Sequence, residues 1–267
     1  MTEDHRLTPG DAINLSELAT RADTFHENRK AAEKVFNELR IELAEWQRRL
    51  YAHGEHKLLI VLQAMDAGGK DSTIRKVFRG VNPQGVRVNS FKAPTSADLA
   101  HDFLWRVHKL VPGTGTIGVF NRSHYEDVLV VRVEEIVPQS VWEARYEQIN
   151  QFEKLLTETG TTILKFYLHI SKDEQRERFQ DRIDEPEKHW KFSHADLEKR
   201  EQWDAYMEVY QAALNRCTTE WAPWYVIPAD QKWYRNLAIA RALVGTLRNL
   251  NPEYPSPKVD ISHLKID

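Results

Sequence analysis

Five short apolar runs alternate with helix-like segments along most of the chain, and this alternation limits the fold more than any other feature. We expect strands at residues 57–64, 86–91, 116–121, 161–170 and 224–228. The first run does not alternate apolar with polar residues, which is typical of a strand buried on both faces. Strands that alternate with helices form βαβ units and a parallel sheet. The pattern therefore predicts an α/β fold with a five-stranded parallel sheet covered on both sides.

The segments between these runs carry helix signals. A helix is predicted from Glu27 to Tyr51, because apolar residues recur there at steps of three and four, and Gly54 ends it. Further helices are expected over residues 70–79, 95–111, 139–158 and 232–250, with a short one before residue 139 and another ending near residue 216. Thr95 opens one of them as an N-cap, and Ser171 with Glu174 forms a capping box that opens another. Residues 1–25 show no periodicity, and we expect them to wrap the surface.

Charge and composition exclude several classes of protein. The chain of 267 residues has 37 Lys and Arg against 40 Asp and Glu, so its net charge of −3 excludes a chain-wide attraction to polyanions. One cysteine excludes a disulfide framework and a multi-cysteine zinc site. The longest apolar run, Leu58 to Leu62, is too short to span a bilayer, and the N-terminus lacks the apolar core of a signal peptide. We expect a soluble cytoplasmic protein with no membrane and no nucleic-acid partner.

A glycine-rich turn follows the first strand and has the character of a phosphate-binding loop. Residues 64–72 read AMDAGGKDS, in which Ala64 replaces the first glycine of the G-x-x-x-x-G-K-[ST] pattern and Asp71 replaces its Ser or Thr. Backbone N–H groups at such a turn, with a helix N-terminus behind them, bind phosphate oxygens. Lys70 adds a point charge there. The alternative is a tight turn that merely exposes its lysine.

Basic residues are concentrated just after this loop and in a later insert. Six of them, against the single acid Asp71, lie between residues 70 and 92: Lys70, Arg75, Lys76, Arg79, Arg87 and Lys92. Residues 184–203 interrupt the alternation with charges, proline and aromatic side chains, and we interpret them as a lid-like insert in one domain of residues 1–267. Basic lids that close over phosphates exclude water. A solvated surface is the alternative for the first group, and we expect Trp190 to pack in the core rather than on a base.

The third strand is followed by NRSHYED, residues 121–127. Phosphoryl transfer needs carboxylates that hold Mg²⁺ and an arginine fork that neutralises phosphate oxygens. Asp66 in the loop, together with Glu126 and Asp127, supplies candidate ligands for Mg²⁺, with Mn²⁺ as an alternative metal. His124 is either a general base or a packed histidine, and an acceptor that is already anionic needs no base. For Glu126 and Asp127 the alternative is the first turn of an ordinary helix.

Five blocks of the chain together resemble the polyphosphate kinase 2 family: MDAGGKDS, SFKAPTSADLAHDFLWR, FNRSHYEDV, EPEKHWKFS and APWYVIPADQKWYR. The resemblance covers roughly residues 57–240. It implies a thymidylate-kinase-like P-loop kinase fold, with three layers and a helical lid. It also implies Mg²⁺-dependent phosphoryl transfer between inorganic polyphosphate and nucleoside mono- or diphosphates. Asn121 stands where the family usually has Asp, and this form resembles the subgroup that accepts both AMP and ADP.

The motifs and the resemblance together indicate roles for particular residues. Those expected to be catalytic are Asp66, Lys70, Arg122, Asp127 and Arg178, and the metal ligands are expected to be Asp66, Asp127 and Glu126. Phosphate and polyphosphate are expected at Ala67, Gly68, Gly69, Lys70, Asp71, Ser72, Arg75, Lys76, Arg79, Arg122, Lys188 and Lys191. The nucleotide is expected at Lys92, Thr95, Asp98, Arg106 and Asn121. The expected partners are polyphosphate, AMP, ADP and ATP, with a second copy of the chain in a dimer or tetramer.

Two other functions remain open from the sequence. One is a kinase that uses ATP to phosphorylate a nucleotide or another small molecule on the same core. ADP formation from AMP with polyphosphate and no ATP distinguishes the two enzymes. The other is a non-catalytic regulator that binds a nucleotide or a polyanion, and the presence of Lys70 with Asp66 and Asp127 argues against it.

Overall fold

The fold is a five-stranded parallel sheet between two layers of helices. It is described by a computed structural model that covers residues 5–23, 25, 28–260 and 265. The strands are β1 (Lys57–Gln63), β2 (Val86–Ser90), β3 (Ile117–Asn121), β4 (Thr161–His169) and β5 (Trp224–Pro228). They lie in the order β2-β3-β1-β4-β5, and every neighbouring pair is parallel. The predicted fold class is therefore confirmed.

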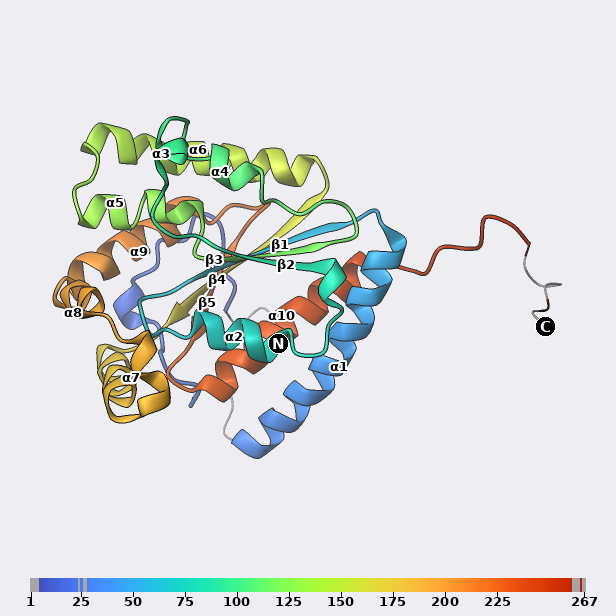
Figure 1. The fold of residues 1–267 in the computed structure, drawn as a ribbon, viewed down its shortest axis with the longest axis horizontal. Helices are drawn as coiled ribbons and strands as arrows, with labels where there is room; N and C mark the ends of the chain where they lie inside the picture. The colour runs from blue at the N-terminus through green and yellow to red at the C-terminus, as the bar shows by residue number, and fades with distance from the viewer. Residues whose placement is uncertain (1–4, 24, 26–27, 261–264, 266–267) are drawn as a thin grey trace.

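The helices separate into two layers and one end group (Figure 1). One face of the sheet is covered by α1 (Arg29–His53), α2 (Lys70–Val77) and α10 (Lys232–Leu250). The other face is covered by α4 (Trp105–His108), α5 (Val130–Val133), α6 (Gln139–Glu158) and α9 (Trp203–Cys217). The end group consists of α7 (Lys172–Asp184) and α8 (His194–Glu201). The remaining short elements are α3 (Ser96–Leu99) and the 3₁₀ turns η1 (Leu15–Glu17), η2 (Pro83–Gly85), η3 (His124–Asp127) and η4 (Pro186–Lys191). The apolar side chains of β1 are almost completely buried between the layers.

The first and last long helices pack on each other. Gly54 ends α1 in the left-handed conformation at φ +73°, as the sequence indicates, whereas Glu27 lies outside the described residues. Arg248 of α10 donates two hydrogen bonds to the carboxylate of Glu42 on α1, with both N–O distances at 2.6 Å. Both helices also bury apolar side chains in the core, among them Leu43 and Leu50 of α1 and Leu243 and Leu247 of α10, although Ile41 stays exposed.

The segment 95–111 differs from its prediction, because it forms two short helices instead of one. Thr95 and Asp98 do form the reciprocal capping box that opens α3. The helix stops at Leu99, and the carboxylate of Asp102 accepts a hydrogen bond from the N–H of Leu104 at 2.9 Å. A short acidic side chain that bonds to the backbone in this way competes with helical hydrogen bonding. The chain therefore restarts as α4 at Trp105.

The predicted capping box of α7 is only half formed. The hydroxyl of Ser171 accepts the N–H of Glu174, as expected of an N-cap. The carboxylate of Glu174 accepts a hydrogen bond from Arg178, and the N–H of Ser171 donates to Asp230 at 2.8 Å. Two longer-range contacts thus take the place of the local one, and they tie the start of α7 to the end of β5.

The N-terminal segment covers one edge of the sheet rather than only wrapping the surface. The N–H of Leu7 donates to the carbonyl of Trp224, and the N–H of Val226 donates to the carbonyl of His5. An open strand edge is a site of unwanted pairing, so this short antiparallel bridge protects β5. Leu15 and Ala22 further along are buried. Among the described residues, no helix has the length and the apolar character needed to cross a membrane.

Candidate active site

The loop between β1 and α2 is shaped by two glycines in close contact with neighbouring groups. Gly69 has φ +100°, and a Cβ built there lies 2.0 Å from Nη1 of Arg235. A Cβ on Gly68 lies 2.5 Å from the Cβ of Ala64 and 2.8 Å from the carbonyl oxygen of Met65. All three distances are shorter than real Cβ contacts, so a larger residue at either position would require the loop or Arg235 to shift. The α2 helix begins at Lys70 directly behind it, which is the arrangement that binds phosphate.

Lys70 is held beneath the loop with its charge in a poorly hydrated position. Its side chain is buried, and its ammonium donates to the carbonyl of Ala64 at 2.7 Å. Burial, followed by the charge of Arg122, lowers the pKa of Lys70 to about 8. A nearby anion stabilises the protonated form of such a lysine. The geometry therefore prepares this ammonium for a phosphate group.

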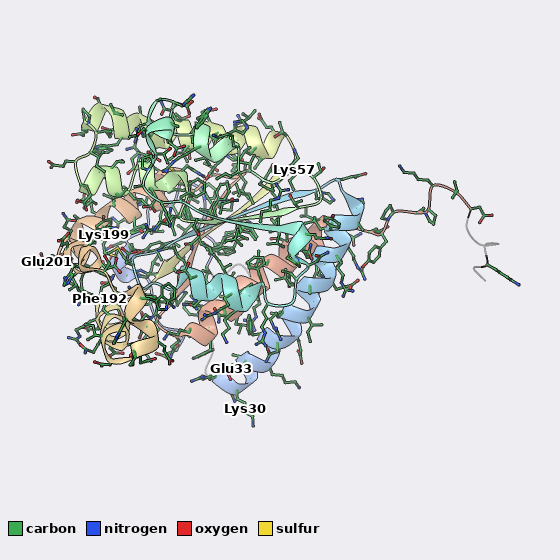
Figure 2. The ribbon with its side chains drawn as sticks, in the orientation of Figure 1. Lys30, Glu33, Lys57, Phe192, Lys199 and Glu201 are labelled. Carbon is green, nitrogen blue, oxygen red and sulfur yellow. The ribbon has the colours of Figure 1, made fainter. Side chains whose placement is uncertain are left out.

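Asp66 and Arg122 face each other at the carboxyl edge of the sheet. Nη2 of Arg122 donates to Oδ1 of Asp66 at 2.7 Å, and Nζ of Lys199 lies 3.6 Å from Oδ2. Burial alone raises the pKa of Asp66, but the charges of Lys70, Arg122 and Lys199 outweigh it and bring that pKa below its ordinary value. The carboxylate is therefore ionised. Figure 2 shows Lys199 on the side of the molecule where α7 and α8 lie, away from Lys57 at the start of β1.

Asn121 links the end of β3 to the first turn of α2 through a side-chain hydrogen bond. Its Nδ2 donates to Oδ1 of Asp71 at 2.6 Å. The amide is the donor, since an ionised carboxylate only accepts. Asp71 departs from the usual phosphate-loop pattern and Asn121 stands where the family usually has Asp, so two of the unusual residues of the sequence bond to each other.

A cavity of about 570 Å³ opens above the loop and is strongly basic. Its lining includes three carboxylates, those of Asp66, Asp71 and Asp181. Against these stand eleven basic side chains: Lys70, Arg75, Lys76, Lys92, Arg122, Arg178, Arg182, Lys188, Lys191, Lys232 and Arg235. They come from α2, α7, the insert and α10 as well as from the strand ends. The structure thus gathers most of the predicted phosphate-binding residues, with Ala67, Gly69 and Ser72 among them.

The residues expected to bind the nucleotide are divided between two spaces. Lys92 and Asn121 line the main cavity, whereas Asp98 and Arg106 line a neighbouring cleft of about 290 Å³ that also includes Lys92. Thr95 lines neither, and its hydroxyl donates to Asp98. Arg79, expected to bind polyphosphate, is exposed in the turn that follows α2 and also lies outside both spaces.

The two acids after β3 have different surroundings. Glu126 lines a small cleft together with Asp66 and Arg122. Asp127 lies with its Oδ1 3.3 Å from Nη1 of Arg145 and its Oδ2 3.7 Å from Nη2 of Arg106. Burial raises the pKa of Asp127, and these arginines oppose the shift only in part. The structure therefore brings Glu126, and not Asp127, to the side of Asp66.

Arg178 is bound mainly to the backbone. Its guanidinium donates to the carbonyls of Ala67 at 2.8 Å and Ala229 at 2.6 Å, and to the carboxylate of Glu174 at 2.7 Å. The side chain is buried at the wall of the cavity. These contacts lock the phosphate loop to the end of β5. Arg178 thus holds the loop in place, a role that its position in the sequence did not reveal.

Arg235 is a site residue that sequence reasoning missed. It is 1% exposed, and it donates to the hydroxyl of Ser72 at 3.0 Å and towards the carbonyl of Gly68 at 3.4 Å. Burial, together with the charge of Arg178, lowers its pKa to about 9. The acceptors that it reaches, including Asn236, are neutral. A buried cation with only neutral partners at a cavity wall is suited to an anionic ligand. In the sequence it is the last residue of the block APWYVIPADQKWYR, but its place on a long helix did not indicate contact with the loop.

Two aromatic positions decide between alternatives that the sequence left open. His124 is fully buried, and its Nε2 bonds to Glu153 at 3.2 Å, so it is a packed histidine. Trp190 is 79% exposed on η4. The expectation of a core position for Trp190 was wrong, because η4 and α8 contain no buried residues and offer no interior to fill.

The site fits a magnesium ion that is held partly by its substrates. Among the described residues, no group of three or more His, Cys, Asp or Glu side chains forms a metal site. Mg²⁺ commonly binds one or two carboxylates and takes its other ligands from phosphates and water, so a cluster is not needed. Asp66 is ionised in the cavity, with Glu126 beside it. This donor set fits Mg²⁺ in a phosphate-bound complex.

A parallel sheet of this order, a glycine loop ahead of α2 and a cationic cavity at the carboxyl ends of the strands define a phosphate-loop kinase. The sequence profile of the family described as Polyphosphate kinase 2 matches residues 26–255. The chain therefore belongs to the polyphosphate kinase 2 family, whose members typically use a divalent metal.

Similar proteins agree with this assignment along the whole chain. The chain is 56% identical to an AMP/ADP-polyphosphate phosphotransferase from Meiothermus ruber, over 98% of this chain and 99% of the relative. It is 45% identical to an ADP-polyphosphate phosphotransferase from Rhodopseudomonas palustris, over 95% and 92% of the two chains. The crystal structure of polyphosphate kinase 2 from Arthrobacter aurescens TC1 matches with a TM-score of 0.93 at 41% identity, over 97% of this chain and 93% of that one. The predicted family is confirmed.

Proposed function

We propose that this protein transfers phosphoryl groups from inorganic polyphosphate to AMP, forming ADP, and to ADP, forming ATP. The observation that carries the proposal is the cavity above the phosphate loop, where eleven basic side chains face three carboxylates in a chain of net charge −3. A donor made of repeated phosphates requires such a local excess of cations. The activities named for the relatives from M. ruber and R. palustris support the same substrates.

The transferred phosphoryl group would lie between the loop and the end of β3. There Lys70 and the loop N–H groups bind its oxygens, and the guanidinium of Arg122 neutralises the charge that builds up during transfer. Asp66, with Glu126 beside it, would hold Mg²⁺ or Mn²⁺, which supplies further positive charge to the phosphates. Arg178 keeps Ala67 and the rest of the loop in position. Catalysis then rests on placement and electrostatics, without a general base.

The donor and the acceptor would approach from different sides. Arg75, Lys76 and Arg235 line the cavity beside the loop and would bind the polyphosphate chain. The nucleotide would occupy the neighbouring cleft, where Arg106 lies over the ring of Phe91 and donates to the carbonyl of Lys92. For Asp127 the contacts favour a role in holding Arg106 and Arg145 over its expected role as a metal ligand.

Residues 184–203 would act as a lid on a single domain. Lys188 and Lys191 line the cavity, and Lys199 of α8 reaches Asp66. Closure over both substrates would exclude water from the reacting phosphates. We also propose that the protein acts in the cytoplasm and forms a homodimer or homotetramer, as expected from the sequence.

The deciding experiment is an assay with AMP, Mg²⁺ and polyphosphate in the absence of ATP. We expect ADP and then ATP to appear, the activity to be lost with EDTA, and Mg²⁺ or Mn²⁺ to restore it. Turnover that occurs only when ATP is supplied would instead identify an ATP-dependent kinase. Binding of AMP or polyphosphate without turnover in the presence of metal would identify a regulator.

A further inference from the structure

Four polar side chains form a hydrogen-bonded group that is wholly buried beneath the end of β3. They are His124, Tyr125, Glu153 and Lys165, and each has 0% exposure. The ammonium of Lys165 donates to Glu153 at 2.6 Å, to the hydroxyl of Tyr125 at 2.8 Å and to the carbonyl of Cys217 at 2.6 Å. A buried ion pair of this kind loses much of its hydration, so stability alone is a poor reason for it.

The carboxylate of Glu153 completes the group. Its Oε1 accepts the hydroxyl of Tyr125 at 2.9 Å and lies 3.2 Å from Nε2 of His124. Burial raises the pKa of Glu153, but Lys165 and His124 outweigh burial and lower it, so the carboxylate is ionised. An ionised carboxylate only accepts, and Nε2 of His124 therefore carries the proton. The first two residues of η3 are thus both fastened to α6, and one of them also to β4.

This turn carries Arg122, whose backbone is in an unusual conformation. Arg122 has φ +61°, in the left-handed region that side chains other than glycine seldom adopt. Such a conformation persists only where the surroundings determine it. On one side, the N–H of Arg122 donates to the carbonyl of Leu62. On the other side, the hydroxyl of Ser123 accepts one hydrogen bond from the side-chain amide of Gln63 and one from the N–H of Tyr125. The side chain of Tyr125 is in turn held by the buried group.

We infer that the buried Glu153–Lys165 pair is a positioning element of the active site: through Tyr125 and His124 it fixes the turn that directs Arg122 at Asp66. Neither member of the pair lines the cavity above the loop. The effect on the reaction passes through the backbone of residues 122–125. The inference rests on the role proposed above for Arg122 in phosphoryl transfer.

The test removes the pair without leaving an unpaired charge. In the double variant Glu153→Leu/Lys165→Met both partners become apolar, so that no buried charge remains, while Tyr125, His124 and the carbonyl of Cys217 lose their hydrogen bonds to the pair. We expect kcat with AMP and polyphosphate to fall by roughly 10- to 100-fold, as for other small misplacements of a catalytic group, with KM for AMP nearly unchanged. Leu156→Ala, on the same helix α6, is the matched control for lost packing. An equal loss of kcat in the control and the double variant at matched thermal stability would overturn the inference.

A second measurement separates positioning from a general structural effect. In an Arg122→Ala background the double substitution should cause little further loss of kcat, because its target is already absent. Independent, multiplicative losses would contradict the inference while leaving the role of Arg122 intact. Full activity of Arg122→Ala alone would instead remove the catalytic assignment of Arg122, and the inference with it. If the double variant does not fold, Tyr125→Phe takes its place, because it removes only the hydroxyl between the two charges. It is then tested alone and in the Arg122→Ala background.

Discussion

The two sides of the active site are built differently. The side formed by the loop and the end of β3 is buried or half-buried, and Lys70, Arg122 and the adjoining Arg178 of α7 are each held by specific hydrogen bonds. The opposite side, residues 184–203, has no buried residue in η4 or α8 and is attached through charge pairs such as Arg182 with Asp196. Side chains that stabilise a transition state need a fixed position before the substrate binds. A segment that has to open for a long substrate is better attached by weak surface contacts, as residues 184–203 are. Variants on the first side should therefore change the chemical step, and variants on the second side should change substrate capture.

The largest effect is expected for Lys70→Ala. The ammonium is buried beneath the loop, where we propose that the transferred phosphate binds, and loss of such a contact costs on the order of 10²-fold or more in kcat. The fold should survive, because the side chain contacts only nearby carbonyls. Steady-state kinetics with circular dichroism as the folding control would test this. Near-normal turnover in the folded variant would remove the phosphate-loop assignment.

A proton should accompany polyphosphate binding in mildly alkaline solution. The pKa of Lys70 is lowered to about 8 in the protein without ligand, so above that pH the side chain is mostly neutral. A bound phosphate favours the charged form, and affinity for polyphosphate should fall as the pH rises through about 8, by up to tenfold per unit. Calorimetry at about pH 8.5 in two buffers of different ionisation enthalpy would measure the uptake. Lys70→Met is the control and should take up no proton through this group.

Arg235→Met should weaken polyphosphate binding and stabilise the fold at the same time. The substitution removes a buried cation with neutral partners, so KM for polyphosphate should rise about tenfold while unfolding becomes more costly by about 1 kcal/mol. KM for AMP should change little. Enzyme kinetics and chemical denaturation of the same preparation would measure both effects. A loss of stability with unchanged KM would show that Arg235 serves the fold and not the donor.

Much of this arrangement was predictable from the sequence because its causes are local. The apolar run of β1, the glycine pair and Lys70 lie within a few residues of one another, so the phosphate loop and its place at the strand end follow directly. The end of β3 was predictable for the same reason, since parallel strands share a carboxyl edge.

The surroundings that the sequence did not indicate depend on distant contacts. Asp127 lies against Arg106 and Arg145, and Arg178 donates to the carbonyls of Ala67 and Ala229. Arg235 reaches the loop from a helix more than 150 positions further along the chain. The expectation for Trp190 rested on the rule that tryptophan side chains are mostly buried, but η4 and α8 contain no buried residue. Contacts between residues so far apart in the chain produce no periodicity or fixed spacing in the sequence, so no sequence pattern predicts them.

Asn121→Asp should change the ratio of the two acceptor activities. The amide of Asn121 donates to Asp71 at 2.6 Å, so the substitution would bring two carboxylates into contact beside the acceptor phosphates. Like charges at this distance favour protonation of one of them or capture of a cation. AMP and ADP carry different charge into that space, and the ratio of their initial rates should shift by roughly three- to tenfold. Asn121→Gln, which keeps the amide, is the control. An unchanged ratio would remove Asn121 as a determinant of acceptor choice.

The smallest effects are expected in residues 184–203, where they test the other half of the comparison. Lys188 already pairs with Glu185 and Asp181, and Lys191 is exposed, so each contributes a screened charge to the cavity. Lys188→Ala and Lys191→Ala should each raise KM for polyphosphate by roughly two- to threefold and leave kcat nearly unchanged. The increase should shrink as salt is added, because screening weakens exposed charge pairs. Trp190→Ala is the matched variant without a change of charge, and its exposed ring predicts no effect on unfolding. A large loss of kcat in any of the three variants would mean that residues 184–203 take part in the chemical step. The contrast between this segment and the side formed by the loop and the end of β3 would then be wrong.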